Sequence, residues 1–420
     1  MADNEYLTVA AAEAAVLAEV TVLGGEKVAL LAALGRILAE DVVAEEQLPP
    51  FPNSAMDGYA VRAEDVVGVE ADNGRSLRVV ADIAAGSWPE VAVTPGTAAR
   101  IMTGAPLPPG ADAIVPVEGT NEPWRASERP LPEQIEIYQE VGSGDYVRPA
   151  GQDIAKGMKV MGVGHRLRPQ EIGVLAALGV AKVAVVRRPR VGILATGDEL
   201  VGVEEALTPG KIRNSNGYAQ AAQVLALGAE PVMLGVAGDT EASVRACLAQ
   251  GVAEGVDLLV SSAGVSVGAY DVVKAVLAAE GEVGFWRVRM RPGKPLAFGR
   301  YQGILYLGLP GNPVSAQLSF ERFVRPAIRK MGGYRAWQRP LVPVIVREDI
   351  GSDGRESYLR AVIERGEEGY EARLTGHQGS NLMSSMVKAN GLVIIPEGVT
   401  EVKAGTSLQG MMIDWPEFVF

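Results

Sequence analysis

The 420-residue sequence has few of the residues that most metal centres and nucleophilic sites require. It contains one cysteine, Cys247, and two histidines, His165 and His377. One cysteine excludes an internal disulfide, which favours a reducing compartment, and two histidines exclude a multi-histidine metal site. The same scarcity argues against a Cys-His or Ser-His catalytic pair. Cys247 lies in a helical pattern and is interpreted as a small core residue.

The sequence also lacks a long apolar run and an excess of basic residues. No apolar stretch approaches the roughly 18 residues of a membrane-spanning helix. The segment Met1–Leu7 has neither the basic start nor the apolar centre of a secretory signal. A net charge of -12 argues against binding to nucleic acid. We therefore expect a cytoplasmic protein with no membrane and no nucleic-acid partner.

What is present is enough apolar sequence, 48% of the chain, for several compact domains. Helical patterns near the N-terminus, including Lys27–Leu38, resume over Arg168–Leu178. Short β-like runs separated by Pro and Gly occupy two further regions. We predict four domains: a discontinuous helical domain (1–46 and 148–179), a β-rich domain (47–147), an α/β domain (180–331) and a C-terminal β domain (332–420).

The α/β domain is predicted from strands and helices that alternate along the chain. Such alternation indicates a sheet that is at least partly parallel, with ligands at the carboxyl ends of its strands. The fold class is therefore multidomain α/β and β, with the α/β domain at its centre. Its expected strands are Val191–Ala195, Pro231–Val236, Val256–Val260, Phe285–Met290 and Ile304–Leu307.

Two glycine-rich stretches, Ser261–Asp271 and Leu309–Ser315, each lie between an apolar run and a helical pattern. This arrangement exposes backbone N–H groups at a helix N-terminus, where the helix dipole also favours phosphate. Neither common nucleotide motif is present. No G-x-G-x-x-G follows the first strand, and Gly293-Lys294 lacks the Walker A glycine and a following Ser or Thr. The loops therefore predict an anion site without supporting a dinucleotide or P-loop protein.

Carboxylates follow the predicted strands at Asp198, Glu199, Asp239 and Asp271. Gathered at one edge of a sheet beside a phosphate-binding loop, they would suit a hard cation such as Mg²⁺. Helix capping, worth about 0.5–2 kcal/mol, also explains an Asp at a helix start. Asp239 and Asp271 each fit capping, whereas Asp198-Glu199 fits it less well. Taken together, the four favour a metal site.

Basic residues concentrate in one segment of this acidic chain. Period-two alternation places Arg287, Arg289 and Arg291 on one face of a strand that runs into Lys294. A solvated edge strand would explain the pattern without function. The alternative is an anion site, because Arg binds phosphate in a bidentate way and Lys supplies a point charge.

Six motifs resemble those of the molybdopterin molybdenumtransferases of the MoeA type, and they occur in the family's order. These enzymes are related to the catalytic end of gephyrin. The resemblance extends from about Tyr6 to Pro396. Any one glycine loop would be weak support, whereas six ordered motifs are specific. They are Leu48–Ala60, Arg100–Pro106, Thr196–Leu200, Ser261–Asp271, Pro292–Pro295 and Leu309–Ser315.

The resemblance implies a four-domain homodimer that inserts molybdenum from molybdate into adenylylated molybdopterin, with Mg²⁺, and releases AMP. In the family the active site joins the α/β domain of one subunit to the second domain of the other. A molybdopterin adenylyltransferase would be a transient partner.

The resemblance also implies roles for individual residues. Arg287 and Arg291 stand where better-known members have lysines, which keeps the charge but changes the hydrogen-bond geometry. The implied metal ligands are Glu199, Asp239 and Asp271. The implied catalytic residues are Asp57, Thr103, Glu199, Asp239, Asp271 and Lys294. The implied substrate-binding residues are Gly264, Ser266, Arg287, Arg291, Pro310, Pro313, Ser315 and Arg360.

Three alternatives stay open at this point. The α/β domain also resembles molybdopterin adenylyltransferase, although that activity needs only one domain. A non-enzymatic scaffold like gephyrin is a second alternative, although this chain has no second α/β domain or long linker. A relative that serves a tungsten cofactor or a specialised oxidoreductase is the third.

Overall fold

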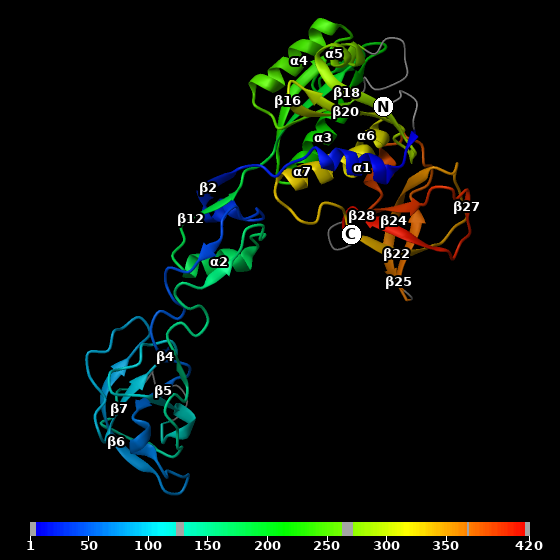
Figure 1. Ribbon diagram of the computed structural model, residues 1–420. Coiled ribbons are helices and arrows are strands. Elements are labelled where there is room, and N and C mark those ends of the chain that lie inside the picture. Colours follow the sequence, from blue (N-terminus) through cyan, green and yellow to red (C-terminus); the bar gives the residue numbers. More distant parts are fainter. Residues whose placement is uncertain (1–5, 123–129, 263–271, 368, 416–420) are drawn as a thin grey trace. The chain divides into compact units, whose positions relative to one another are not determined.

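The computed structural model describes residues 6–122, 130–262, 272–367 and 369–415. The chain forms two compact units (Figure 1). The larger unit comprises Met1–Lys27, Gly35–Ala39 and Ala184–Phe420, and the smaller comprises Val28–Leu34 and Glu40–Val183. Each is described in turn.

The centre of the larger unit is a sheet of seven described strands. Four of them are parallel neighbours: β21 (Ile304–Leu309), β17 (Leu258–Ser262), β13 (Arg190–Thr196) and β16 (Glu230–Ala237). The antiparallel strands β20 (Pro295–Tyr301) and β18 (Gly281–Val288) extend one edge, and β1 (Tyr6–Leu7) pairs in parallel with β18. The expected strands are thus present, and the sequence pattern missed β20.

Helices cover both faces of this sheet. Successive strand residues point to opposite faces, so Leu258 and Val260 enter one core cluster and Leu259 enters the other. Burial on both faces explains why the parallel strands are almost continuously apolar. One cluster includes helices α1 (Val9–Ala18), α3 (Ser215–Ala226), α6 (Pro313–Ser319) and α7 (Arg325–Met331), and the other includes α4 (Glu241–Ala253) and α5 (Val272–Glu280).

The N-terminal region differs from the sequence prediction in two ways. The expected helix Lys27–Leu38 is wrong: the chain forms β2 (Gly25–Ala29) and a short 3₁₀ turn, Leu30–Ala33. Leu31 and Leu34 are 81% and 52% exposed, whereas Ile37 and Leu38 are buried in extended chain, where Leu38 forms a bridge with Val185. The apolar repeat therefore does not form one buried helix face. Helix α1, which was grouped with 148–179, buries Val9, Ala12 and Val16 in the larger unit.

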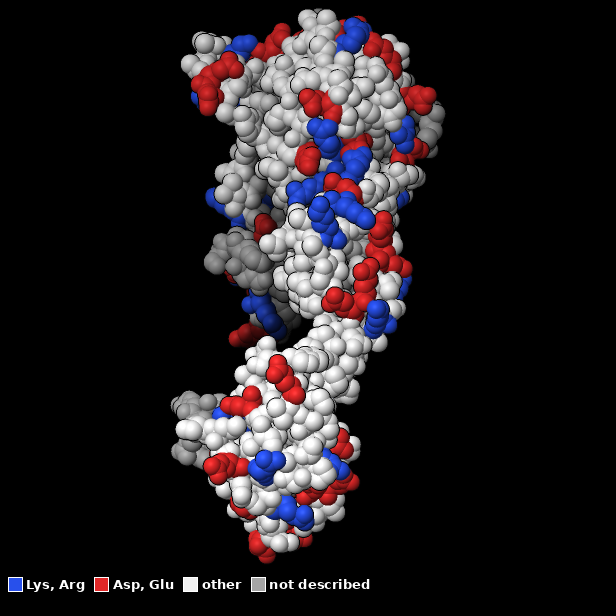
Figure 2. All heavy atoms as spheres, turned by 90° about the vertical axis from the view of Figure 1, so that its left-hand side faces the viewer, with Lys and Arg blue, Asp and Glu red and all other residues white. Residues whose placement is uncertain are grey.

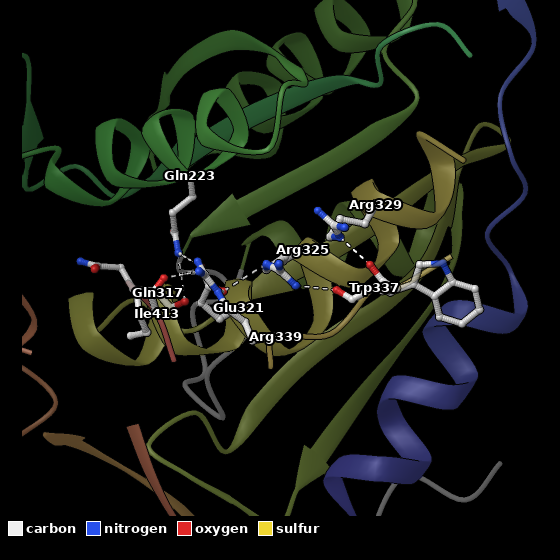
Figure 3. Close-up of polar contacts among 9 residues, drawn as sticks. Gln223, Gln317, Glu321, Arg325, Arg329, Trp337, Arg339 and Ile413 are labelled. Carbon is white, nitrogen blue, oxygen red and sulfur yellow. Dashed lines mark hydrogen bonds and ion pairs between the residues drawn. The ribbon is translucent and has the colours of Figure 1, made fainter. Parts of the chain in front are cut away.

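A buried polar network surrounds the π-helix η5 (Phe320–Val324), which joins α6 to α7 (Figure 3). The amide of Gln223, from α3, donates to Glu321 Oε1 at 3.4 Å. Arg339 donates to the same carboxylate and to the main-chain oxygen of Ile413. Arg325 Nη1 donates to the oxygen of Trp337 at 2.5 Å. These contacts tie α3 and η5 to the chain that enters and leaves the C-terminal domain.

The C-terminal domain is a closed barrel of five described strands. Its strands pair in the order β24, β25, β22, β28 and β26, and β26 returns to β24. The short strand β19 (Met290–Arg291), from the α/β domain, pairs in parallel with β24. This pairing sets Arg291 beside Ser357. The barrel strands are β22 (Leu341–Val346), β24 (Glu356–Gly366), β25 (Gly369–Leu374), β26 (Gly391–Ile395) and β28 (Ser407–Met412).

The smaller unit contains a sheet of five described strands in the order β8, β5, β7, β6, β9. Gly58 of β5 packs closely against β8, because a Cβ there would lie 2.1 Å from the oxygen of Val115. The unit also contains helix α2 (Pro169–Ala177). The strands are β5 (Gly58–Val61), β6 (Arg75–Ile83), β7 (Thr97–Ile101), β8 (Ala113–Pro116) and β9 (Gln134–Ile137).

Within the described ranges, no helix combines the length and apolar character needed to cross a membrane.

Candidate active site

A cleft of about 770 Å³ opens in the larger unit where the carboxyl ends of β13 and β21 meet the C-terminal barrel. This is the edge at which ligands bind in α/β sheets. Both domains of the unit contribute to it. The α/β domain provides Thr196, Glu199, Asn214–Asn216, Arg291–Pro295, Pro310–Pro313 and Ser315, and the C-terminal domain provides Arg355 and Gln378–Ser380.

Glu199 is held in the cleft by the turn that follows β13. Gly197 has a φ of +136°, which favours glycine, and the Glu199 carboxylate lies directly over it. A Cβ at position 197 would be 2.2 Å from Glu199 Oε2. The glycine of the Thr-Gly-Asp-Glu motif therefore leaves the space that the carboxylate occupies.

Asp198 and Asp239 connect the ends of two neighbouring strands. The backbone N–H of Asp239 donates to Asp198 Oδ1 at 3.0 Å, and that of Asp198 lies 3.4 Å from Asp239 Oδ2. Asp239 therefore lies beside the Thr196–Leu200 motif. This agrees with the prediction that carboxylates following neighbouring strands lie close together. Asp271, Gly264 and Ser266 lie outside the described residues. Among those described, no group of three or more His, Cys, Asp or Glu is placed to hold a metal.

Lys294 lines the cleft and also contacts the N-terminal strand. The pairing of β1 with β18 sets Tyr6 opposite Arg287. Lys294 Nζ lies 5.2 Å from the centroid of the Tyr6 ring, and Arg287 Cζ lies 5.9 Å from it. A hydrogen bond from Lys294 lowers the pKa of Tyr6 below its usual value. Arg287 thus packs beside Tyr6, and nothing in the sequence pattern indicated this contact.

The alternation predicted for 287–291 is present, but the strand breaks after Val288. Val288 and Met290 are fully buried. Because of the break, the arginines reach different partners: Arg289 Nη1 lies 2.6 Å from Glu397 Oε1, and Arg291 turns into the cleft. Arg291 Nη1 is 3.8 Å from Asp353 Oδ2.

Arg360 lies behind the cleft wall and is fully buried. Its Nε donates to Ser385 Oγ at 3.1 Å and its Nη2 donates to the oxygen of Gly379, also at 3.1 Å. Among the described residues, Nη1 has no hydrogen-bond partner. Burial lowers the pKa of Arg360 to about 10, and the charge of Arg291 adds to this. A buried cation with an unused donor is a candidate anion-binding group.

The loop before α6 places Pro310 in the cleft, and the first turn of α6 places Pro313 and Ser315 there. Pro313 occupies the first turn of the helix, where the missing N–H costs nothing. The backbone N–H of Val314 donates to the oxygen of Ser380 at 3.0 Å, so the barrel caps this helix. Asn216 Nδ2 donates to the oxygen of Gly311 at 2.7 Å and braces the loop from α3.

Several contributors to the cleft were missed by the sequence analysis, among them Asn216, Arg355, Gln378 and Ser380. The run Asn214-Ser215-Asn216 has the residue types of a helix start, and Asn214 caps α3 by accepting from Gly217 N at 2.9 Å. That signal locates the helix without indicating that its first turn faces the cleft. Gln378 is positioned by contacts with the Arg360 main chain, which no sequence pattern shows.

Asp57 and Thr103 lie together in the smaller unit. Both the backbone N–H and the hydroxyl of Thr103 donate to Asp57 Oδ1, at 2.6 and 2.7 Å. Pairing of β5 with β7 sets Gly58 opposite Ile101. It therefore brings Asp57, just before β5, close to Thr103, just after β7. Two sequence motifs thus form one exposed polar cluster.

The fold and the cleft define a multidomain protein built around an α/β domain whose cleft, at the carboxyl ends of the strands, is lined by cationic side chains. Family models match three consecutive regions: the MoeA N-terminal region (domain I and II) over residues 7–179, a probable molybdopterin binding domain over 192–330, and the MoeA C-terminal region (domain IV) over 343–410. The chain belongs to the MoeA family, the molybdopterin molybdenumtransferases, and is an enzyme of molybdenum cofactor biosynthesis.

Similar proteins agree with this assignment. A molybdopterin molybdenumtransferase from Nostoc is 40% identical over 388 residues, which is 90% of this chain and 87% of the relative. Molybdopterin molybdenumtransferase 2 from Mycobacterium tuberculosis is 41% identical over 389 residues, 91% of this chain and 93% of the relative. The crystal structure of a molybdopterin biosynthesis MoeA protein from Pyrococcus horikoshii has a TM-score of 0.83 and 31% identity, and the match covers 98% of this chain and 100% of that one. The predicted family, fold class and enzymatic nature are confirmed.

Proposed function

We propose that this enzyme transfers molybdenum from molybdate to adenylylated molybdopterin and releases AMP, with Mg²⁺ bound near the phosphates. The observation that carries the proposal is the composition of the cleft. Arg291, Lys294 and Arg355 line one side, Arg360 lies behind it, and Glu199 lies at the end of β13. Breaking a phosphoanhydride requires charge neutralisation and positioning, which cations and a metal-binding carboxylate together supply.

Molybdate is the oxyanion that we assign to the cationic wall, by which we mean the cleft-lining side chains of Arg291, Lys294 and Arg355. Arg360 has a donor without a partner among the described residues, and Ser315 adds a buried hydroxyl that lines the same cleft. Arg291 adds a partly exposed guanidinium to the lining of the cleft. Because guanidinium groups donate in a planar fork, they suit a tetrahedral oxyanion.

The described residues fit a Mg²⁺ ion through their chemistry. Glu199 and Asp239 offer carboxylate oxygens, and Mg²⁺ sites in enzymes typically use one or two carboxylates with water and substrate phosphate. We assign Asp271 as the third ligand. When bound, the ion would neutralise charge on the phosphate oxygens. The chain's own part is to orient these carboxylates: the Gly197 turn positions that of Glu199, and the backbone N–H of Asp198 donates to Asp239 Oδ2.

We also propose a cytoplasmic homodimer whose active site combines Asp57 and Thr103 of one subunit with the cleft of the other. A molybdopterin adenylyltransferase would supply the adenylylated substrate in a transient encounter. We propose no nucleic-acid partner. In support, Figure 2 shows that Lys and Arg side chains of the larger unit lie among Asp and Glu side chains on the face it displays.

The proposal is tested by incubating the protein with adenylylated molybdopterin, Mg²⁺ and molybdate and following AMP release by chromatography. AMP release should depend on molybdate, and Lys294→Ala should slow it by about 100-fold. Lys403→Ala is the matched control, because Lys403 pairs with Asp349 on the barrel. Molybdate-independent release would contradict the proposal, and AMP transfer from ATP to molybdopterin would indicate the adenylyltransferase instead. Replacing molybdate with tungstate tests the metal preference.

A further inference from the structure

Asp353 contacts both arginines that line the cleft beside the barrel. It lies in the turn between β23 (Ile350–Gly351) and β24. Its Oδ2 atom accepts from Arg355 Nη2 at 2.5 Å and from Arg355 Nε at 3.1 Å. The same oxygen is 3.8 Å from Arg291 Nη1. One carboxylate oxygen therefore faces two guanidinium groups.

The backbone fixes this carboxylate in place. The N–H of Arg355 donates to Asp353 Oδ1 at 3.2 Å, so the second oxygen is also engaged. Hydrogen bonding from Arg355 lowers the pKa of Asp353 below its usual value, which keeps the group ionised. Asp353 is 38% exposed, and its two arginine partners are 43% and 33% exposed, so solvent and ligand both reach the cluster.

The charges around the cluster are unbalanced. Arg291, Lys294 and Arg355 line the cleft, and Arg360 adds a buried cation whose pKa is lowered by burial and by the charge of Arg291. Within the described part of the chain, Asp353 is the carboxylate that forms ion pairs with Arg291 and Arg355. An incoming oxyanion therefore competes with Asp353 for the same donors.

We propose that Asp353 is an internal counter-ion that weakens oxyanion binding at the cationic wall and keeps the bound oxyanion exchangeable. The inference rests on the proposed function, because it takes this wall as the molybdate site. A cluster of cations without a counter-ion would hold a dianion tightly, whereas molybdenum must leave the wall during each turnover. Asp353 also keeps both guanidinium groups ordered before the anion arrives.

The effect is electrostatic and should therefore scale with the charge of the ligand. Asp353→Asn removes the negative charge while keeping an oxygen that accepts from Arg355. Molybdate carries two negative charges, and perrhenate is a tetrahedral oxyanion with one. Removing one negative charge beside the wall should therefore strengthen the binding of molybdate by a larger factor than the binding of perrhenate. A packing defect would affect both anions alike.

The test is isothermal titration calorimetry of the full-length protein with molybdate and with perrhenate. Asp353→Asn should bind molybdate at least about threefold more tightly at low ionic strength, and the gain should shrink as salt screens the charges. Perrhenate should gain less. Asp349→Asn is the matched control: it removes a barrel carboxylate that pairs with Lys403, and it should leave both affinities unchanged.

Two further results separate this inference from the proposed function. If Arg291→Ala weakens molybdate binding but Asp353→Asn leaves it unchanged or weaker, the inference is overturned and the oxyanion site stands. If molybdate affinity does not depend on Arg291, the result contradicts both the oxyanion site and the counter-ion role of Asp353. Thermal unfolding of each variant shows whether the fold is retained.

Discussion

The guanidinium of Arg339 spans the carboxylate of Glu321, with Nε 2.9 Å from Oε2 and Nη2 3.2 Å from Oε1 (Figure 3). Arg325 Nε lies 3.6 Å from the same Oε2, and burial lowers the pKa of Arg325 to about 10. Glu321 and Arg325 are buried and Arg339 is partly buried, so two cations share one anion in a largely buried cluster.

Replacing Glu321 with Gln should destabilise the larger unit by about 3 kcal/mol, because the buried guanidinium of Arg325 and the partly buried one of Arg339 would lose their anion. Thermal unfolding would measure the change. Glu371→Gln provides the comparison, since it removes the more exposed Arg347–Glu371 pair and should cost less than about 1 kcal/mol. Equal losses in the two variants would show that the Glu321 network contributes no more than a surface ion pair.

Gly197→Ala should reduce activity far more than stability. The new Cβ would push the Glu199 carboxylate out of its position, and a shift of about 1 Å in a catalytic group costs on the order of 100-fold in rate. Steady-state AMP release and thermal unfolding, measured together, check this. Gly210→Ala is the control: Gly210 has a φ of +82°, but its Cβ would have nothing within 4 Å. Comparable activity in the two variants would remove the steric argument.

Two inactive variants should complement each other if the active site is shared between subunits. Asp57→Ala and Lys294→Ala affect different units of the chain. In a randomly exchanged equal mixture, half the dimers carry one intact site of two, so about a quarter of wild-type activity should return. Subunit exchange is followed by fluorescence transfer between labelled chains. Exchange without recovered activity would place all catalytic residues in one subunit.

Glu171 should make stability depend on acid pH. Hydrogen bonds from Arg168 lower the pKa of Glu171 to about 2, with His165 contributing further. Because the folded-state pKa is depressed, the stabilisation is complete above the unfolded value near 4.5 and is lost as pH falls toward 2. Glu171→Gln should therefore cost about 1 kcal/mol at neutral pH. The difference from wild type, measured by urea unfolding, should vanish across this window, and a pH-independent difference would contradict the assignment.

Much of the larger unit was predictable because its strands are buried on both faces. Such strands leave continuous apolar runs, and the helices between them repeat at their own period. β20 was missed because Pro295 opens it and Gly299 interrupts it, which weakens the β pattern. The helix predicted at Lys27–Leu38 was wrong because the tertiary structure leaves Leu31 and Leu34 of its apolar repeat exposed. No local pattern reveals that exposure.

The candidate site was predictable where a motif carries its own geometry. Glu199 and the Pro310–Pro313 loop follow directly from turns at strand ends. Arg355 and Gln378 could not be found in this way, because they reach the cleft only through the pairing of β19 with the barrel and the contacts of Arg360. Long-range pairing of this kind is decided by packing and has no period in the sequence.

The N-terminal helix has an unusual place in the order of synthesis. Val9, Ala12 and Val16 of α1 pack into a core that includes Phe320, Phe323 and Ala327, and Glu13 pairs with Arg322 at 2.5 Å. The ribosome makes α1 more than 300 residues before these partners. Throughout translation this helix therefore carries an uncovered apolar stripe, while the whole smaller unit can fold between the two events. Premature termination between α1 and η5 would leave that stripe exposed, so such truncated chains should be recognised by chaperones and proteases through α1.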